Sequence, residues 1–143
     1  MKLMRVGELG EESEAVCLSE GRVIDVSSAV DNFDGAGIGA GGLRELMELL
    51  ERQSNKFPEI DMEGRRIGTP ISRPGNILAI GLNYADHAAE AGMEVPTEPV
   101  LFAKAPSSFT GPNDTVLIPR TSVKTDWEIE LGVVIGKLSL IHI

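Results

Sequence analysis

Two glutamates near the end of the chain, Glu128 and Glu130, have the residue type and spacing of a divalent-cation site. They lie in the stretch Thr125 to Lys137, TDWEIELGVVIGK, whose alternation of polar and apolar residues predicts a β-strand. Side chains two positions apart on a strand share a face, with their Cα atoms roughly 6.5 Å apart. Carboxylates held side by side repel each other unless water or a cation separates them, and a hard cation such as Mg²⁺ prefers oxygen ligands. The competing interpretation is an ordinary amphipathic strand with a solvated acidic face.

His87 and Glu90 form a second pair with chemical potential. The alanine-rich segment ADHAAEAG predicts a short helix that stops at Gly92, with Asn83 or Asp86 as its N-cap. Residues three apart share a helical face, and a histidine held by a carboxylate can take a proton from water near neutral pH. The alternative is an ordinary polar pair on a surface helix.

Lys104 is the third candidate. It ends the predicted strand Val100 to Lys104, VLFAK. If the side chain faces a cavity, its ammonium group would bind an anionic part of a substrate. The commoner fate of such a lysine is to extend into solvent.

Further elements must position these residues. The apolar run Ile77 to Ile80 predicts a strand buried on both faces, and Val116 to Ile118 predicts another short strand. Prolines and glycines interrupt regular structure in TPISRPGN, residues 69–76. We therefore predict a domain boundary near Pro70, with one domain over residues 1–70 and a second over 71–143.

The N-terminal part is predicted to be a small β-rich domain. Short strands are expected at Lys2 to Val6, Glu14 to Ser19 and Arg22 to Val26. Leu43 to Arg52 then shows helical spacing, with Leu43, Leu46, Met47 and Leu50 on one side.

The glycine-rich segment DGAGIGAGG, residues 34–42, contains the G-x-G-x-x-G spacing of dinucleotide-binding loops. That fingerprint requires a buried strand running directly into the glycines, whereas Ser27 to Asn32 is largely polar. We therefore predict a flexible connector and no nucleotide site.

Composition excludes several classes of protein. A net charge of −9 over 143 residues offers no basic face for nucleic acid. Cys17 is the only cysteine, which excludes an internal disulfide and a cysteine-based zinc site, and we expect it to be buried packing. Neither a long apolar run nor a signal-peptide pattern is present, so we expect a cytoplasmic protein that does not bind membranes.

Four ordered motifs in the second half resemble the fumarylacetoacetate hydrolase family. They are IGLNYADHAAE, EPVLFAK, GPNDTVLIP and DWEIELGVVIG, running from Ile80 to Gly136. The resemblance implies an α+β fold that is mainly β: a mixed β-roll catalytic domain, present here in its N-terminal part only, preceded by a small β-rich domain. It also implies that the full-length form is a homodimer.

The resemblance implies a role for each candidate residue. Glu128 and Glu130 match two carboxylate ligands of a divalent ion, Mg²⁺ or Mn²⁺, with Ca²⁺ as a further candidate. His87 and Glu90 match a pair that activates water. Lys104 matches a lysine near the pocket.

The implied chemistry is hydrolysis of a carbon–carbon bond in a diketo or 2-oxo acid. Activated water would attack a carbonyl that the metal polarises, and the leaving carbanion would depart as an enolate that the metal stabilises. Ureidoglycolate lyase-like, isomerase and oxo-acid decarboxylase activities remain alternatives within the family. Outside it, the alternative is an inactive fragment or a non-catalytic binding module.

The end of the chain departs from the family pattern. Relatives continue beyond this strand and supply a third ligand, an aspartate, whereas this chain reads LSLIHI after Lys137 and ends at Ile143. We expect a truncated chain that binds metal weakly, with little activity, exposed apolar edges and low solubility, and we expect His142 to be incidental.

Overall fold

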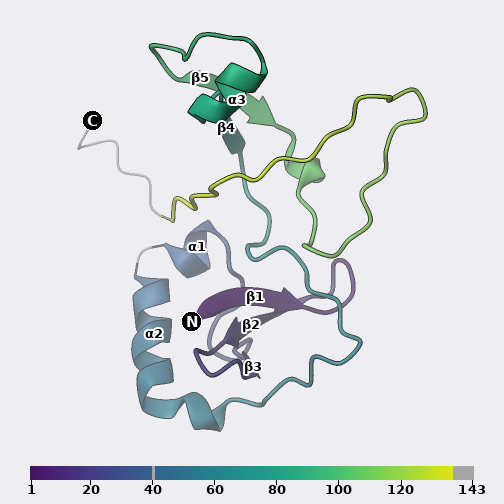
Figure 1. The fold of residues 1–143 in the computed structure, drawn as a ribbon. Helices are drawn as coiled ribbons and strands as arrows, with labels where there is room; N and C mark the ends of the chain where they lie inside the picture. Colours follow the sequence, from purple (N-terminus) through teal and green to yellow (C-terminus); the bar gives the residue numbers. More distant parts are fainter. Residues whose placement is uncertain (40, 137–143) are drawn as a thin grey trace. The chain divides into compact units, whose positions relative to one another are not determined.

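The computed structural model describes residues 1–39 and 41–136. It contains two compact units, one formed by Met1–Ser72 together with the residues from Thr110 onward, the other by Arg73–Phe109. Both units combine short strands with a few helices (Figure 1), which agrees with the coarse prediction of a mainly β protein. The β-roll and the domain boundary near Pro70 stay predictions.

The first unit contains a three-stranded antiparallel sheet. Its strands are β1 (Lys2–Val6), β2 (Ser13–Cys17) and β3 (Val23–Asp25), in the order β1-β2-β3. The predicted strands are therefore confirmed, with small shifts at their ends. Ala15 and Val16 of the central strand are both fully buried although adjacent strand residues point to opposite faces, so both faces of the sheet are covered.

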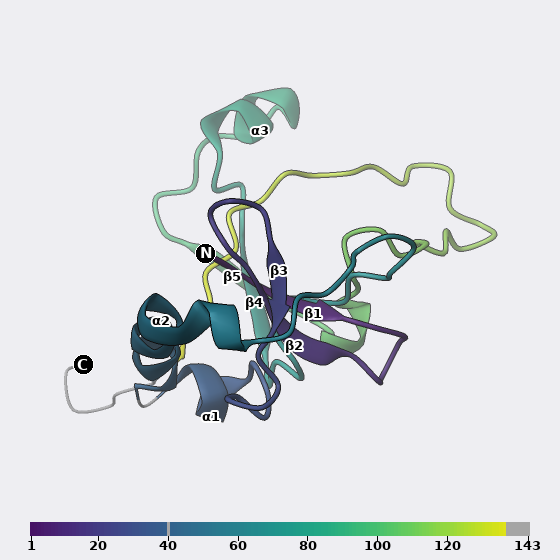
Figure 2. The same cartoon turned by 90° about the horizontal axis from the view of Figure 1, so that it is seen from below.

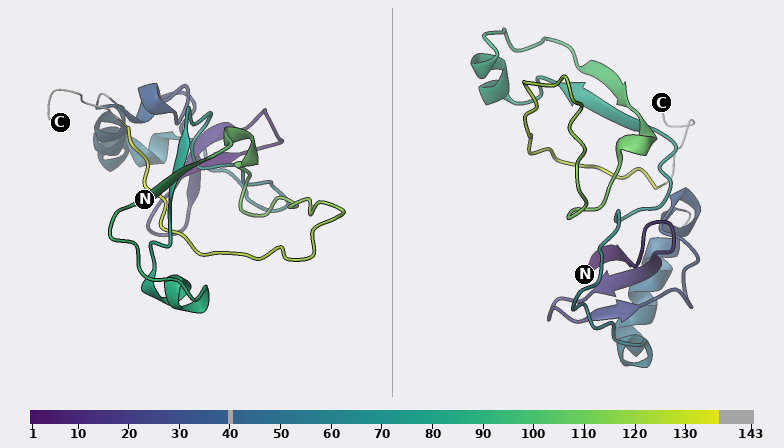
Figure 3. Two further views of the ribbon diagram at one scale, coloured as in Figure 1. Left: turned by 90° about the horizontal axis from the view of Figure 1, so that it is seen from above. Right: turned by 90° about the vertical axis from the view of Figure 1, so that its right-hand side faces the viewer.

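Helix α2 (Gly42–Gln53) packs on one face of this sheet (Figures 1 and 3). The predicted helix is confirmed. The buried apolar side of α2 is narrower than expected, because Leu46 and Leu50 are buried whereas Met47 is 45% exposed. The residues that form this core are Val16, Ile24, Val26, Phe33, Leu46 and Leu50.

The glycine-rich connector contains a single helical turn, α1 (Gly35–Ile38), which the prediction of a flexible connector did not include. The carboxylate of Asp34 accepts hydrogen bonds from the amides of Ala36 and Gly37, each at 2.9 Å. This N-cap stabilises a turn that its glycines alone would disfavour. A 3₁₀ turn, η1 (Ser54–Lys56), follows α2.

Both edges of the sheet are covered by one returning segment. The Asp25 amide donates to Pro58 O at 2.9 Å, alongside β3, and the Gly68 amide donates to Arg5 O at 2.8 Å, alongside β1. Isolated bridges join Ile24 to Glu59 and Val6 to Ile67. The returning segment therefore protects edges that would otherwise offer free hydrogen-bonding groups.

The second unit is a two-stranded antiparallel ribbon with a short helix. It contains β4 (Ile77–Gly81), α3 (Ala85–Glu90), β5 (Val100–Lys104) and the 3₁₀ turn η2 (Pro106–Ser108). Figure 3 shows β4 and β5 side by side. Both predicted strands are confirmed. The expectation that the first is buried on both faces is wrong, because Leu78 is 63% exposed and β5 is the only strand that pairs with β4 among the described residues.

The predicted helix of this unit is confirmed, but its predicted N-cap is not. The N-cap position is held by Tyr84, not by Asn83 or Asp86. Gly92 has φ of +66° and its amide donates to Ala89 O at 3.1 Å, as expected of the glycine that ends a helix.

Two predicted strands are wrong within the described part of the chain. Val116 to Ile118 and the described residues of Thr125 to Lys137 form no strand, and Figure 2 shows this stretch as coil. Their sequences alternate suitably, but a strand also needs a hydrogen-bonded neighbour, and no described segment pairs with them. Lys137 itself lies outside the described residues. No helix of the described residues has the length and apolar character needed to cross a membrane.

Candidate active site

Glu128 and Glu130 lie in the extended coil that replaces the predicted strand. Both are exposed, and so are their apolar neighbours Trp127 and Ile129, at 78% and 79%. Both side chains are therefore accessible to solvent. Without a regular strand, the structure does not fix them on one face, and their pairing as metal ligands stays a prediction.

His87 and Glu90 lie on α3, one turn apart and both exposed. Ala88 between them is fully buried, so one side of the helix is covered whereas the pair is exposed. This arrangement permits access by water or a substrate. It does not by itself assign either residue a chemical role.

Lys104 ends β5 and is exposed. Its Nζ lies 5.9 Å from the centre of the Phe102 ring, near the outer limit of a cation–π interaction. The ammonium group is thus held close to the ribbon surface, where it can still reach an anion.

The predicted residues divide between the two units. His87, Glu90 and Lys104 belong to the unit Arg73–Phe109, whereas Glu128 and Glu130 belong to the first unit. No group of three or more metal-binding side chains is assembled within residues 1–39 and 41–136. The combined site therefore stays a prediction. His142 falls outside the described residues, and the third ligand was expected beyond residue 143.

A small cavity of about 220 Å³ lies in the second unit beside the start of α3. Leu82, which lines it, has φ of +52°, a conformation uncommon for residues other than glycine. Asn83 lines it too. Sequence reasoning assigned these residues no part in a pocket, and its only signal was the interruption of the apolar run at Gly81.

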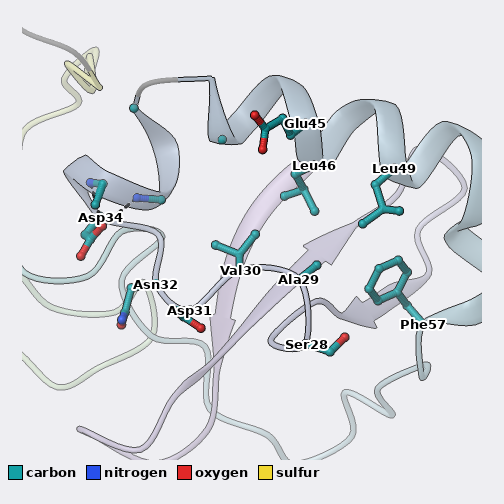
Figure 4. A pocket seen from close by; sticks show the side chains of 14 residues that line it. Ser28, Ala29, Val30, Asp31, Asn32, Asp34, Glu45, Leu46, Leu49 and Phe57 are labelled. Atoms are coloured by element: carbon teal, nitrogen blue, oxygen red, sulfur yellow. Dashed lines mark hydrogen bonds between the residues drawn. The ribbon is translucent and has the colours of Figure 1, made fainter.

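A larger cavity of about 830 Å³ lies in the first unit, between α2 and the loop that precedes α1 (Figure 4). Leu49 and Phe57 supply apolar wall, and three carboxylates line it, those of Asp31, Asp34 and Glu45. An oxo acid is itself anionic, so this acidic lining disfavours it. None of the predicted site residues lines this cavity.

An ionic cluster in the first unit was not predicted from sequence. It contains Arg66, Asp114 and Glu12. Hydrogen bonds from Arg66, and next from the Gly111 amide, lower the pKa of Asp114 from 3.8 to about 2. Burial raises the pKa of Glu12, but the hydrogen bond from Arg66 and other contacts, including the charge of Arg5, outweigh it and leave a lowered pKa. The pKa of Arg66 is raised, first by Asp114 and then by Glu12. Carboxylates whose pKa is lowered in this way make poor general bases near neutral pH. We therefore assign the cluster a structural role, in which Arg66 holds Glu12 and Asp114 together.

Comparison with known proteins identifies the second half of the chain. The family model described as the fumarylacetoacetate hydrolase C-terminal region matches residues 76–141. This segment belongs to the fumarylacetoacetate hydrolase family. The predicted family is thereby confirmed, and the matched segment contains all five candidate site residues of the fumarylacetoacetate hydrolase pattern.

Curated relatives that match this chain include proteins from Burkholderia. Proteins of Burkholderia multivorans and Burkholderia ambifaria, both provisionally named hydrolases, are 49% and 48% identical over 136 residues. The match covers 95% of this chain and 47% of each relative. The chain thus spans about half the length of the curated relatives it matches.

A solved structure is also similar. It is a crystal structure from Mycobacterium smegmatis of a protein provisionally named HpcE, 29% identical, with a TM-score of 0.54. The similarity covers 84% of this chain and 41% of that one. It supports the fold of the fumarylacetoacetate hydrolase family for most of the described residues.

Proposed function

We propose that this chain belongs to a divalent-metal-dependent hydrolase that cleaves a carbon–carbon bond in a diketo or 2-oxo acid. The observation that carries the proposal is the family match over residues 76–141, which contains all the candidate residues. Relatives named hydrolases, 48–49% identical, support hydrolysis over other reactions.

The available donors fit a hard divalent cation. Glu128 and Glu130 are exposed carboxylates two positions apart, and Mg²⁺ in proteins is commonly bound by one or two carboxylates and several waters. These two glutamates would hold the ion. A bound ion would supply Lewis-acid polarisation of a substrate carbonyl oxygen.

The remaining residues would handle the proton and the substrate charge. His87 would accept a proton from the attacking water, and Glu90 would stabilise the resulting imidazolium. The hydroxide oxygen would bond to the carbonyl carbon while the carbonyl π electrons move to the carbonyl oxygen. As the carbonyl re-forms, the carbon–carbon bond would break, and its electron pair would pass to the leaving carbon, which takes up the proton held by His87. Lys104 would pair with the substrate carboxylate.

Mn²⁺ binding tests the metal site directly. Water proton relaxation would be followed during Mn²⁺ titration of the 143-residue chain, of Glu128→Gln and of Glu130→Gln, with Glu94→Gln as a charge-matched control. We expect weak binding that each ligand substitution lowers at least several-fold and the control leaves unchanged. Binding that survives both ligand substitutions would contradict the assignment.

Activity tests the reaction. Pyruvate release from a 2,4-dioxo acid would be measured with the wild-type chain and with His87→Asn and Glu90→Gln. We expect low activity with Mn²⁺ that either substitution reduces by about 10²-fold or more. Equal activity in wild type and both variants would contradict the assigned roles, and no activity above background in any of the three would favour a non-catalytic module.

A further inference from the structure

Residues 110–114 dock closely on the N-terminal part of the first unit. Gly111 is buried, and a Cβ atom there would collide with the Ile67 carbonyl oxygen and lie 3.2 Å from the Cα of Gly68. Only glycine allows the two backbones to approach so closely. The glycine at position 111 therefore helps to set where the two backbone segments cross.

A two-pronged ion pair lies beside this crossing. Arg66 Nε donates to Asp114 Oδ1 at 2.8 Å, and Nη2 donates to Oδ2 at 2.7 Å. The side chains are only 19% and 23% exposed. Asp114 Oδ2 also accepts from the Gly111 amide at 2.8 Å and from Thr110 Oγ1 at 3.1 Å. Paired parallel hydrogen bonds of this kind fix orientation as well as distance.

The turn between β1 and β2 holds the guanidinium of Arg66 in place for this contact. Its Nη1 donates to Glu12 Oε1 at 2.7 Å and to Gly7 O at 3.2 Å. The Arg66 carbonyl in turn accepts from the Gly7 amide at 3.1 Å. Glu12, with a side chain 5% exposed, is also bound by Arg5 Nη2 at 3.2 Å. Arg66 is thus fixed by contacts that do not involve Asp114.

We propose that Arg66 is a positioning residue for the acidic segment. It fixes the loop 110–114 on the N-terminal sheet and so sets where the chain that carries Glu128 and Glu130 begins. The aspartate of the GPND motif, Asp114, then acts through Arg66. The docking stands apart from the proposed function, whereas its effect on metal binding rests on that function.

Amide hydrogen exchange in the 143-residue chain tests the docking. The variants are Arg66→Met, Arg66→Lys and the control Arg22→Met, which removes an exposed cation that pairs with Glu20. In Arg66→Met we expect the amides of Gly111 and Asp114 to exchange about tenfold faster or more, with Val16 unchanged. Arg66→Lys should keep part of the protection, because lysine has the positive charge but cannot donate the two parallel hydrogen bonds of the guanidinium. Arg22→Met should match the wild type.

Asp114→Asn provides a second route if Arg66→Met does not fold. This substitution leaves the contact between Arg66 and Glu12 in place. It should accelerate exchange of the Gly111 amide and leave the Val16 amide unchanged. Unchanged exchange at Gly111 in both variants would overturn the proposal. Equal acceleration at Gly111 and Val16 would also overturn it, because the pair would then only stabilise the whole unit.

Mn²⁺ affinity separates this proposal from the proposed function. If the wild-type chain binds Mn²⁺, Arg66→Met should lower its affinity several-fold, and unchanged affinity would overturn the positioning role. A wild-type chain that binds no Mn²⁺ contradicts the proposed function, and hydrogen exchange then decides the docking alone.

Discussion

Asp114 is kept ionised by hydrogen bonds from its neighbours, first of all from Arg66. Because its pKa is lowered from 3.8 to about 2, the native state binds a proton less readily than the unfolded chain does. The resulting stabilisation is fully present above about pH 4 and is lost as the pH falls towards 2.

Substituting Asp114 by Asn should therefore change the acid limb of the stability profile. We expect the free energy of unfolding of wild type to fall between pH 4 and pH 2 more steeply than that of Asp114→Asn. Urea unfolding at several pH values measures this. Asp31→Asn, at an exposed position, should keep the wild-type slope, and parallel profiles for wild type and Asp114→Asn would contradict the prediction.

Glu14 is a buried carboxylate with two partners. It is 3% exposed and its Oε1 accepts from Arg5 Nε at 3.1 Å and from the Phe33 amide at 3.2 Å. Glu14→Ala leaves a buried amide and a part-buried guanidinium without this acceptor, so we expect a loss of about 1–3 kcal/mol in the free energy of unfolding. Urea denaturation measures it.

The matched control is Glu20→Ala. Glu20 pairs with Arg22 at an exposed position, and such pairs contribute little. Equal losses for Glu14→Ala and Glu20→Ala would show that burial does not set the cost.

Helix α2 stabilises the first unit mainly through its buried leucines. Leu50 is 5% exposed and lies in the core with Phe33 and Ile24. Leu50→Ala should lower the free energy of unfolding by about 2–5 kcal/mol, because it removes apolar contacts and leaves a cavity. Met47→Ala on the same helix, at a position 45% exposed, should cost about 0.5 kcal/mol or less. Thermal and urea unfolding would reveal a similar cost for both if the helix were not packed as described.

Local pattern predicted most elements, because their signals lie within a few residues. Helical spacing identified α2, and alternation or apolar runs identified β1 to β5. The same alternation failed at residues 125–136, since it reports which faces a strand would have and not whether a partner strand pairs with it. The turn α1 was missed because glycine weakens helical propensity and the capping by Asp34 was not weighed.

The candidate site residues were identified from sequence motifs and their roles stay predictions, whereas the ionic cluster around Arg66 was not predicted. His87, Glu90 and the two glutamates follow from motifs that are contiguous in sequence. The pair of Arg66 with Asp114 joins residues 48 positions apart, and no periodicity links them. Its only trace in the sequence was the GPND motif, whose glycine and aspartate carried no assigned partner.

On the scale of the whole chain, the coil of residues 116–136 exposes many apolar side chains. Leu131 is 82% exposed, Ile129 79% and Leu117 86%, and contiguous apolar exposure of this extent marks interaction or aggregation surfaces. We expect the chain to bind the dye ANS and to self-associate with rising concentration. The double substitution Ile129→Thr with Leu131→Thr should reduce both, measured by fluorescence and sedimentation.

Leu9→Thr is the control for that prediction. Leu9 is 80% exposed but lies in a polar turn, so its removal should change neither dye binding nor association. If the double substitution behaves like Leu9→Thr, the apolar stretch is not the source of association.

The crossing of Gly111 over Ile67 has a consequence for how such proteins can be rebuilt. The backbone leaves the first unit after Ser72 and returns at Thr110, and the returning Gly111 lies directly against residues 67 and 68. A segment that leaves and re-enters a unit at neighbouring points has the layout of a domain insertion, and insertions are tolerated where their ends lie close together. We therefore expect the N-terminal core to keep its own contacts when residues 73–109 are exchanged for the equivalent stretch of a relative or replaced by a short linker.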